Sequence, residues 1–169
     1  LNIFRNSPGI LVLNKDNEVT RDIKSSREIR YFSRYEETNS FYVIDDFIYY
    51  KGSRVFDTRK LHIRGRHNYE NICACMSAIC DLVDIDKSFK VIEEFGGVEH
   101  RLEFVREING VKWYNDSVSS SPTRTIAGLN SYEERIVLIA GGYDKNLDYS
   151  PLAEPILRHV SKLILFGAT

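Results

Sequence analysis

Three short segments of the chain combine side chains and backbone that suit anionic ligands. Residues 115–122, NDSVSSSP, follow an aromatic run, residues 141–148, GGYDKNLD, follow an all-apolar run, and residues 167–169, GAT, follow another. In open α/β sheets, ligands gather at the carboxyl ends of strands, because loops and helix N-termini point there. We therefore expect the three segments to lie at one edge of a sheet and to form a ligand site.

The segment GGYDKN offers both backbone and charge to an anion. Its two glycines let backbone approach a ligand closely, and Lys145 carries a mobile positive charge. The segment lacks the glycine spacing of a dinucleotide-binding fingerprint or of a P-loop. A turn that ends a strand, with a solvated lysine, is the alternative interpretation.

Residues 67–71, HNYEN, place two amide side chains at the start of a predicted helix. Asn68 and Asn71 are three residues apart and share one helix face. A carboxamide offers a donor beside an acceptor, which complements the N6/N7 edge of adenine. The alternative is structural, with Asn68 as the N-cap of the helix, and the residues alone favour it.

Residues 96–105, GGVEHRLEFV, put His100 and Arg101 just after a pair of glycines. The glycine pair ends a helical pattern and is the best candidate for a domain boundary. Arginine suits bidentate phosphate recognition. A solvated arginine on a strand is the commoner use of this residue type.

The elements that precede the glycine pair change from strands to helices along the chain. Alternating aromatic and aliphatic residues predict a meander with strands at Phe41–Ile44 and Phe47–Tyr50, after an earlier strand in the run GILVLN. Apolar residues at helical spacing then predict helices in 68–83 and 84–95.

The elements after the glycine pair predict an α/β fold. A hairpin turns at Asn109-Gly110, and a helix runs from Pro122 to about Leu129, with Ser121 as its N-cap. An apolar strand, a helix capped by Ser150 with Pro151 at its first position, and a second apolar strand follow. Apolar strands without alternation predict a parallel sheet that is covered on both faces.

Composition excludes several classes of function. The 169 residues are 43% apolar and 28% charged, with a net charge of −1, so charge gives no case for binding nucleic acid or an anionic membrane surface. No apolar run reaches the ~20 residues of a membrane span. Cys73, Cys75 and Cys80 lack a fourth partner with metal-site spacing. We expect no metal site, and instead reduced core cysteines in a cytoplasmic protein.

Four segments occur in an order that resembles the Mur ligases, the ATP-dependent amide-forming enzymes of peptidoglycan synthesis. They are HNYEN, FGGVEHRLEFV, GVKWYNDSVSSSPTRTIAGL and IVLIAGGYDKNLDYSPL. The combination of HRLE with NDS is most similar to the members that add D-glutamate. The resemblance covers nearly the whole chain and is strongest over residues 64–150.

The resemblance implies two parts of a larger bacterial enzyme. Residues 1–98 resemble the later part of the central ATP-binding domain, and 99–169 the first part of the Rossmann-like C-terminal domain. The family's P-loop, its Mg²⁺ ligands and its modified lysine are expected before Leu1. The full-length enzyme is expected to be a monomer, and an exposed sheet edge in the piece favours association through that edge.

The resemblance also implies the residues that meet the nucleotide. Asn68 and Asn71 correspond to contacts with adenine, which favours the amide interpretation over capping. Arg101 corresponds to an arginine that meets the nucleotide phosphates when the domains close, and Asp116 to an acid that contacts the ribose.

For the incoming amino acid, Ser120 corresponds to a hydroxyl near the carboxylate of glutamate, and Lys145 to a lysine that pairs with D-glutamate. With Arg101, these two are the implied catalytic residues. The family's usual text after NDS is Lys-Ala-Thr-Asn, whereas this chain has Val118 in place of the lysine. One cation of the usual pattern is therefore missing.

The implied reaction joins D-glutamate to UDP-N-acetylmuramoyl-L-alanine. ATP phosphorylates the carboxylate of the UDP-linked substrate, and the amine of D-glutamate attacks the acyl phosphate. Without the P-loop, the piece alone is expected to be inactive. Two alternatives stay open: another ligase of the superfamily, such as a folylpolyglutamate synthase-like enzyme, and a non-catalytic nucleotide-binding α/β module.

Overall fold

The computed structural model describes residue 4 and residues 6–168. The chain forms two compact units, Leu1–Gly96 and Gly97–Thr169, and each is described by itself. The division falls inside the glycine pair that ends the helical pattern. The assignment of the units to two domains of a Mur ligase stays a prediction.

The first unit begins with a pair of short parallel strands. β1 (Leu11–Asn14) pairs with β2 (Ile29–Phe32), and Leu11 lies opposite Ile29. The sequence pattern predicted β1 but not β2. The two strands are joined to the rest of the unit by a bridge between Ser33 and Tyr42.

The predicted meander is confirmed. β3 (Phe41–Ile44), β4 (Phe47–Tyr50) and β5 (Ser53–Asp57) form an antiparallel sheet in that order. Asp45 adopts a left-handed backbone in the first turn, with a φ of 55°. A 3₁₀ turn, η1 (Thr58–Lys60), follows the sheet.

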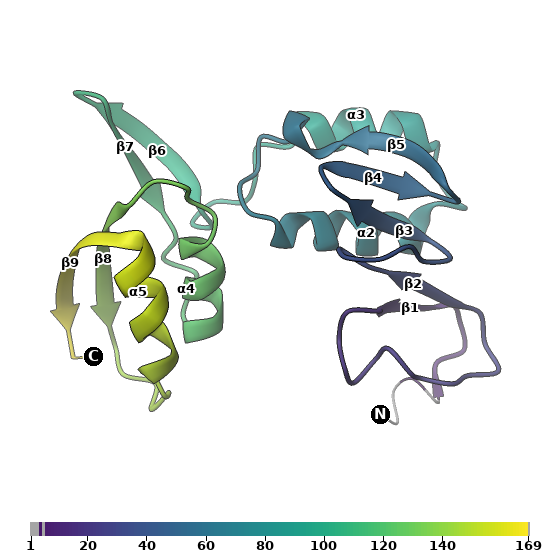
Figure 1. Cartoon of the computed structure of the whole chain (residues 1–169), viewed down its shortest axis with the longest axis horizontal. Helices are drawn as coiled ribbons and strands as arrows, with labels where there is room; N and C mark the ends of the chain where they lie inside the picture. Colours follow the sequence, from purple (N-terminus) through teal and green to yellow (C-terminus); the bar gives the residue numbers. More distant parts are fainter. Residues whose placement is uncertain (1–3, 5, 169) are drawn as a thin grey trace. The chain divides into compact units, whose positions relative to one another are not determined.

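Two helices cover the meander, as Figure 1 shows. They are α2 (His67–Ile79) and α3 (Ile85–Glu94), and both confirm helices predicted from the apolar spacing. Asp84 caps α3, because its side chain accepts a hydrogen bond from the Lys87 amide at 3.0 Å. The core between helices and sheet holds Phe41, Val43, Ile48, Phe56, Ile72, Cys73, Met76 and Phe89.

The cysteines are less uniform than predicted. Cys73 is fully buried in the core, but Cys75 is exposed and Cys80 is half-buried at the end of α2. Residues 73 and 75 are two apart, and on a helix such residues do not share a face. The prediction of three core cysteines is therefore wrong for Cys75. Within the described residues, no group of three acidic, histidine or cysteine side chains is placed to hold a metal.

The second unit begins with the predicted hairpin. β6 (Glu103–Ile108) and β7 (Val111–Asn115) pair in antiparallel fashion. Asn109 and Gly110 have φ values of 51° and 79°, the left-handed pair of a type I′ turn. The Asn-Gly signal in the sequence is therefore confirmed.

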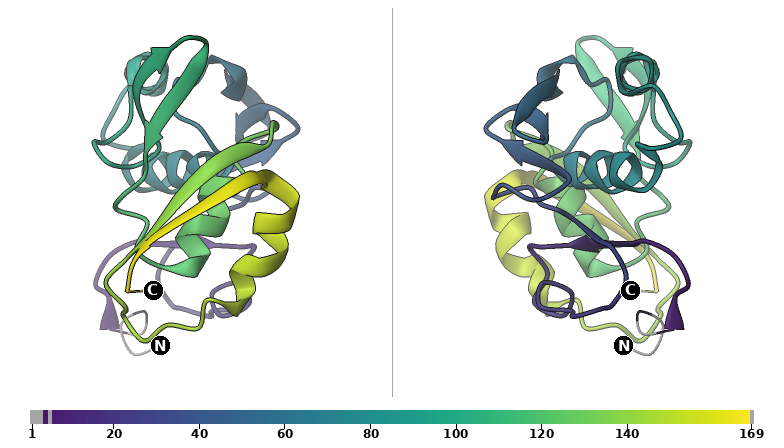
Figure 2. Two further views of the ribbon diagram at one scale, coloured as in Figure 1. Left: turned by 90° about the vertical axis from the view of Figure 1, so that its left-hand side faces the viewer. Right: turned by 90° about the vertical axis from the view of Figure 1, so that its right-hand side faces the viewer.

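The rest of the second unit is a parallel strand pair with two helices. The elements are α4 (Pro122–Leu129), β8 (Ile136–Gly142), a 3₁₀ turn η2 (Ser150–Leu152), α5 (Ala153–His159) and β9 (Val160–Gly167). β8 and β9 are parallel, and α4 and α5 lie on one face of the pair (Figure 2). The α/β class and the parallel pairing are confirmed.

Three details of the second unit differ from prediction. Among the described strands, β7 pairs with β6 and not with β8, so it does not extend the parallel sheet. Alternate residues of β8, such as Val137 and Ile139, are exposed, so the expected cover on both faces is wrong. Ser150 lies inside η2, and the cap position is Tyr149, so Ser150 is not the N-cap.

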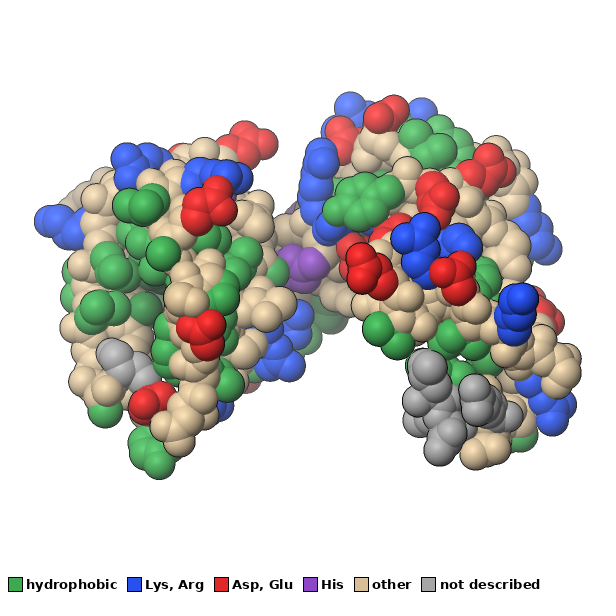
Figure 3. Space-filling model, turned by 60° about the horizontal axis from the view of Figure 1, so that its bottom comes forward, with side chains coloured by type: hydrophobic (Ala, Val, Ile, Leu, Met, Phe, Trp, Pro, Cys, Tyr) green, Lys and Arg blue, Asp and Glu red, His purple; other side chains and the backbone are tan. Residues whose placement is uncertain are grey.

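Apolar side chains remain on the surface of the second unit. On β9, exposed positions include Leu165 and Phe166, and hydrophobic side chains are visible across this part of the surface in Figure 3. Among the described residues, no helix has the length and apolarity to cross a membrane.

Candidate functional site

The candidate site in the second unit begins with two loops that are hydrogen-bonded to each other. One carries Arg101, and the other follows β7 and carries Asp116. The Leu102 amide donates to Oδ1 of Asp116 at 3.1 Å, and the Val118 amide donates to the His100 carbonyl at 3.2 Å. The fold therefore brings together the two loops that carry Arg101 and Asp116, the residues to which the resemblance assigns contacts with the ribose and phosphates of the nucleotide.

Asp116 is half-buried beside helix α4. A Cβ at Gly128 would lie 3.1 Å from Oδ2 of Asp116 and 3.6 Å from Cδ2 of Leu102. Glycine at this buried position therefore leaves room for the carboxylate. Oδ1 of Asp116 accepts a backbone hydrogen bond from Leu102, whereas Oδ2 lies on the side of the carboxylate that faces Gly128.

Arg101 itself is exposed. Its amide donates to the Val98 carbonyl at 3.2 Å, and the residues on either side, His100 and Leu102, have left-handed φ values of 64° and 47°. Non-glycine residues rarely adopt this backbone, and it concentrates at functional sites. No signal in the sequence pattern predicts these two conformations.

Ser120 lies in the short loop between Asp116 and α4. The Ser119 amide donates to the Asp116 carbonyl at 2.9 Å, and the Ser120 amide donates to the Val118 carbonyl at 2.8 Å. Ser121 occupies the cap position of α4 with extended backbone, but its side chain makes no capping bond. The predicted helix start is confirmed, and the hydroxyl of Ser120 is exposed to solvent.

Lys145 lies in the exposed loop after β8. Two side-chain turns shape this loop: Oδ1 of Asp144 accepts from the Asn146 amide at 2.8 Å, and Oδ1 of Asp148 accepts from the Ser150 amide at 2.9 Å. The hydrogen bonds from Ser150 lower the pKa of Asp148. The two aspartates therefore shape the loop after β8, and the Lys145 side chain is exposed to solvent.

Two of the three predicted segments meet at one sheet edge. Gly142 of the GGYDKN segment lies opposite Gly167, and the Ala168 amide donates to the Gly142 carbonyl at 2.9 Å. Thr169, the last residue of GAT, lies outside the described residues. The NDSVSSSP segment follows β7, which is not part of this strand pair, so the prediction of one shared edge is not met for it.

Asn68 and Asn71 lie on the first turns of α2 in the first unit. Nδ2 of Asn68 donates to the Arg64 carbonyl at 2.6 Å, and Nδ2 of Asn71 donates to Oδ1 of Asn68 at 3.1 Å. The cap position is Arg66, so the N-cap interpretation of Asn68 is wrong. The two amides share one helix face, as the spacing predicted.

A half-buried cluster of charged side chains in the first unit includes Glu70, which lies on α2 between the two asparagines. Nε of Arg34 lies 3.2 Å from Oε1 of Glu70, and the Asp16 carboxylate accepts from Ser33 and from the Arg34 amide. Burial raises the pKa of Glu70. None of these residues was singled out from the sequence.

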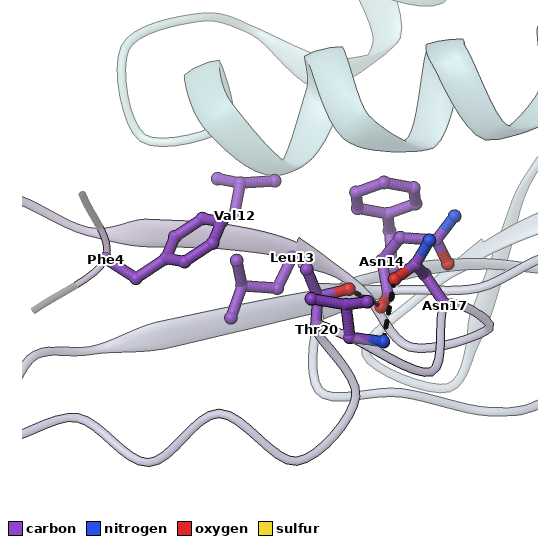
Figure 4. Close-up of a pocket in the computed structure, with 8 residues that line it drawn as sticks. Phe4, Val12, Leu13, Asn14, Asn17 and Thr20 are labelled. Atoms are coloured by element: carbon purple, nitrogen blue, oxygen red, sulfur yellow. Dashed lines mark hydrogen bonds between the residues drawn. The ribbon is translucent and has the colours of Figure 1, made fainter. Parts of the chain in front are cut away.

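An open, mostly apolar hollow lies beside β1, and Figure 4 shows its lining. Phe4, Val12 and Leu13 contribute apolar surface. Thr20 closes one side, because its hydroxyl donates to the Asn14 carbonyl at 2.6 Å. No residue of the predicted sites lines this hollow.

The fold of the chain is similar to that of a solved Mur ligase. The chain superposes on the crystal structure of MurF from Acinetobacter baumannii with a TM-score of 0.66. The match covers 96% of this chain and 43% of that one, and its 18% sequence identity makes it evidence for the fold alone. No protein-family model matches the chain.

The curated relatives of the chain carry the name of one enzyme. The chain is 45% identical to UDP-N-acetylmuramoylalanine–D-glutamate ligase of Clostridium beijerinckii over 99% of its length. It is 40% identical to the enzyme of the same name from Clostridium perfringens over 98% of its length. These matches confirm the resemblance to the D-glutamate-adding Mur ligases. The chain spans 37% of the length of each of these relatives.

Proposed function

We propose that this chain is part of an ATP-dependent ligase that adds D-glutamate to UDP-N-acetylmuramoyl-L-alanine in peptidoglycan biosynthesis. The observation that carries the proposal is 40–45% identity to ligases of that name along nearly the whole chain. The hydrogen-bonded loops of Arg101 and Asp116 support it. A nucleotide offers its phosphates to the arginine and a ribose hydroxyl to the aspartate.

The reaction proceeds through an acyl phosphate. The γ-phosphate of ATP passes to the carboxylate of the UDP-linked substrate, and ADP leaves. The amine of D-glutamate then attacks the acyl carbon through a tetrahedral intermediate, loses a proton, and expels phosphate as the amide forms. Both substrates and ATP are anionic, so positive groups must lower their repulsion and closure must exclude water from the acyl phosphate.

This chain supplies part of that charge. In the proposal, Arg101 meets the nucleotide phosphates, Lys145 pairs with a carboxylate of D-glutamate, and Ser120 donates a hydrogen bond to that amino acid. All three side chains are exposed in the described structure, so they are accessible to ligands. Val118 contributes no charge and is 43% exposed.

In the proposal, neutral amide side chains bind the adenine of the nucleotide, and an acidic side chain binds its ribose. Asn68 and Asn71 offer amides to the adenine edge, and the carboxylate of Asp116 accepts from a ribose hydroxyl. Mg²⁺ would neutralise the phosphates in such ligases. The described residues of this chain hold no cluster of ligands that fits it, and no step is assigned to a metal bound here.

The test is a substrate-resolved kinetic comparison in the full-length enzyme. Lys145→Ala removes one charge-assisted hydrogen bond, worth about 1.5–3 kcal/mol, which corresponds to an increase of about 10- to 150-fold in KM for D-glutamate. KM for ATP should change by less than about twofold, because the lost contact weakens the binding of D-glutamate and not the binding of ATP.

Lys162→Ala is the matched control, because Lys162 is an exposed lysine of the same unit on β9. It should leave both KM values unchanged. An unchanged D-glutamate KM in Lys145→Ala would remove Lys145 from the site. Equal use of L-glutamate or of another amino acid would point to a different ligase of the superfamily.

The proposal includes the setting of the enzyme. A ligase of UDP-linked precursors works in the bacterial cytoplasm, and we expect the full-length enzyme to be a monomer. Among the described strands, β8 and β9 pair only with each other, and the open edges of this pair favour association of the chain when it is studied alone.

A further inference from the structure

The backbone around Arg101 is held in a conformation that it would not adopt alone. His100 and Leu102, on either side of the arginine, are both left-handed. Such residues persist only where surrounding contacts determine them. The arginine side chain is exposed, so these backbone contacts fix the point on the loop from which it projects.

Asn115 is in the right place to supply the contacts that hold the arginine loop. It ends β7, directly before Asp116. Its Oδ1 accepts a hydrogen bond from the Ser117 amide at 3.1 Å, which fixes which side of the carboxamide is oxygen. Nδ2 therefore faces the other way, toward Nδ1 of His100 at 2.8 Å and Oε2 of Glu103 at 3.4 Å.

The contacts of Asn115 close a ring around the arginine loop. Oε2 of Glu103 also accepts from the His100 amide at 2.8 Å, so Asn115 and Glu103 hold both the side chain and the backbone of His100. Two bonds described above complete the ring: the Leu102 amide donates to the Asp116 carboxylate, and the Val118 amide donates to the His100 carbonyl. These last two bonds join the arginine loop to the segment that begins with Asn115.

We infer that Asn115 is a positioning residue whose side-chain amide fixes the loop that carries Arg101. It touches neither substrate in this inference and acts through His100 and Glu103. The effect of this positioning on ATP rests on the proposed function, whereas the fixing of the loop does not.

The structural test uses the chain as described here. In Asn115→Ala, hydrogen exchange of the Leu102 and Val118 amides should accelerate by about tenfold or more, because their partners are no longer held. Asn130→Ala is the control, since Asn130 is an exposed asparagine at the end of α4 in the same unit. It should leave exchange at Leu102 and Val118 unchanged.

Asn115→Asp separates positioning from a local turn. Aspartate keeps the oxygen that accepts from Ser117 but loses the amide donor and puts a carboxylate against Glu103. We expect it to behave like the alanine variant. Wild-type exchange in Asn115→Asp would mean that the residue only shapes its own turn, and would overturn the inference.

A second variant guards against misfolding of the first. His100→Asn removes the imidazole acceptor, while asparagine tolerates left-handed backbone. It should accelerate exchange at the same two amides. Unchanged exchange there in both His100→Asn and Asn115→Ala would overturn the inference and leave the proposed function intact.

The kinetic test uses the full-length enzyme. Asn115→Ala should raise KM for ATP about tenfold and leave KM for D-glutamate within about twofold. Faster exchange with an unchanged KM for ATP in an active enzyme would overturn the positioning role. If the wild-type enzyme formed no amide product, the proposed function would fail, and the exchange data would still decide whether Asn115 fixes the loop.

Discussion

Gly141 is the position where the structure makes its sharpest prediction about stability. It is the sixth residue of β8, with a φ of 139°, and it lies opposite Phe166 of β9. A Cβ at this position would lie 1.7 Å from the Phe166 carbonyl oxygen. Gly142, the next residue, has nearly the same φ of 138°, but a Cβ there would meet no atom within 4 Å.

The two alanine variants therefore separate backbone strain from collision. Both carry the penalty of a φ that side chains avoid, about 1–3 kcal/mol. Gly141→Ala must also push the strands apart near Phe166, and loss of about two ladder hydrogen bonds adds about 1–3 kcal/mol. For a unit of this size, 1 kcal/mol lowers Tm by about 4–8 °C, so Gly141→Ala should melt at least about 4 °C below Gly142→Ala.

Trp113 makes the assay specific to the second unit. It is the chain's single tryptophan and lies on β7, so its fluorescence reports the thermal unfolding of that unit. Circular dichroism would follow the chain as a whole. Equal Tm values for Gly141→Ala and Gly142→Ala would refute the register in which Gly141 lies opposite Phe166.

Two further predictions concern the first unit. Burial raises the pKa of the Cys73 thiol to about 12. Iodoacetamide should therefore label exposed Cys75 in the native chain and Cys73 only after unfolding, as mass spectrometry would show. Labelling of Cys73 in the native chain would contradict the core packing. Hydrogen bonding to the Arg59 side chain lowers the pKa of Asp57 from 3.8 to about 2. The contribution of Asp57 to stability is therefore present above about pH 4 and is lost as pH falls toward 2. The free energy of urea unfolding of Asp57→Asn should depend less on pH in that range than that of wild type. Equal pH dependence would mean that the Asp57–Arg59 pair does not stabilise the fold.

Local signals in the sequence predicted the elements that depend on local chemistry. The meander strands follow from alternation around Asp45-Asp46, and the hairpin follows from Asn109-Gly110. Helix α4 begins at Pro122, where proline's fixed φ suits the first turn. In each case neighbouring residues determine the structure, so no distant contact is needed to predict it.

Elements that depend on distant contacts were missed. β2 is four residues long and contains the buried Arg30, whose guanidinium pairs with Glu28 and with Asp81 beyond α2. That pairing, rather than an apolar pattern, keeps a charged residue inside a strand. The exposure of Cys75 likewise depends on which face of α2 meets the sheet.

The candidate site was predicted only in part. The order of motifs indicated Arg101 and Asp116, and the structure places their loops in contact. It did not indicate Asn115 or Gly128, because their roles depend on hydrogen-bond direction and on space beside a carboxylate. The roles of Ser120 and Lys145 stay predictions. Both side chains are exposed, so contacts within the chain do not indicate what they bind.

Amide formation by the full-length enzyme tests the central claim most directly. The enzyme would be supplied with UDP-N-acetylmuramoyl-L-alanine, ATP, Mg²⁺ and either D-glutamate or L-glutamate, and the UDP-linked product measured by mass spectrometry with phosphate release in parallel. We predict one phosphate released per amide formed, with D-glutamate and not with L-glutamate. Phosphate release without an amide product, or equal product from both enantiomers, would contradict the account.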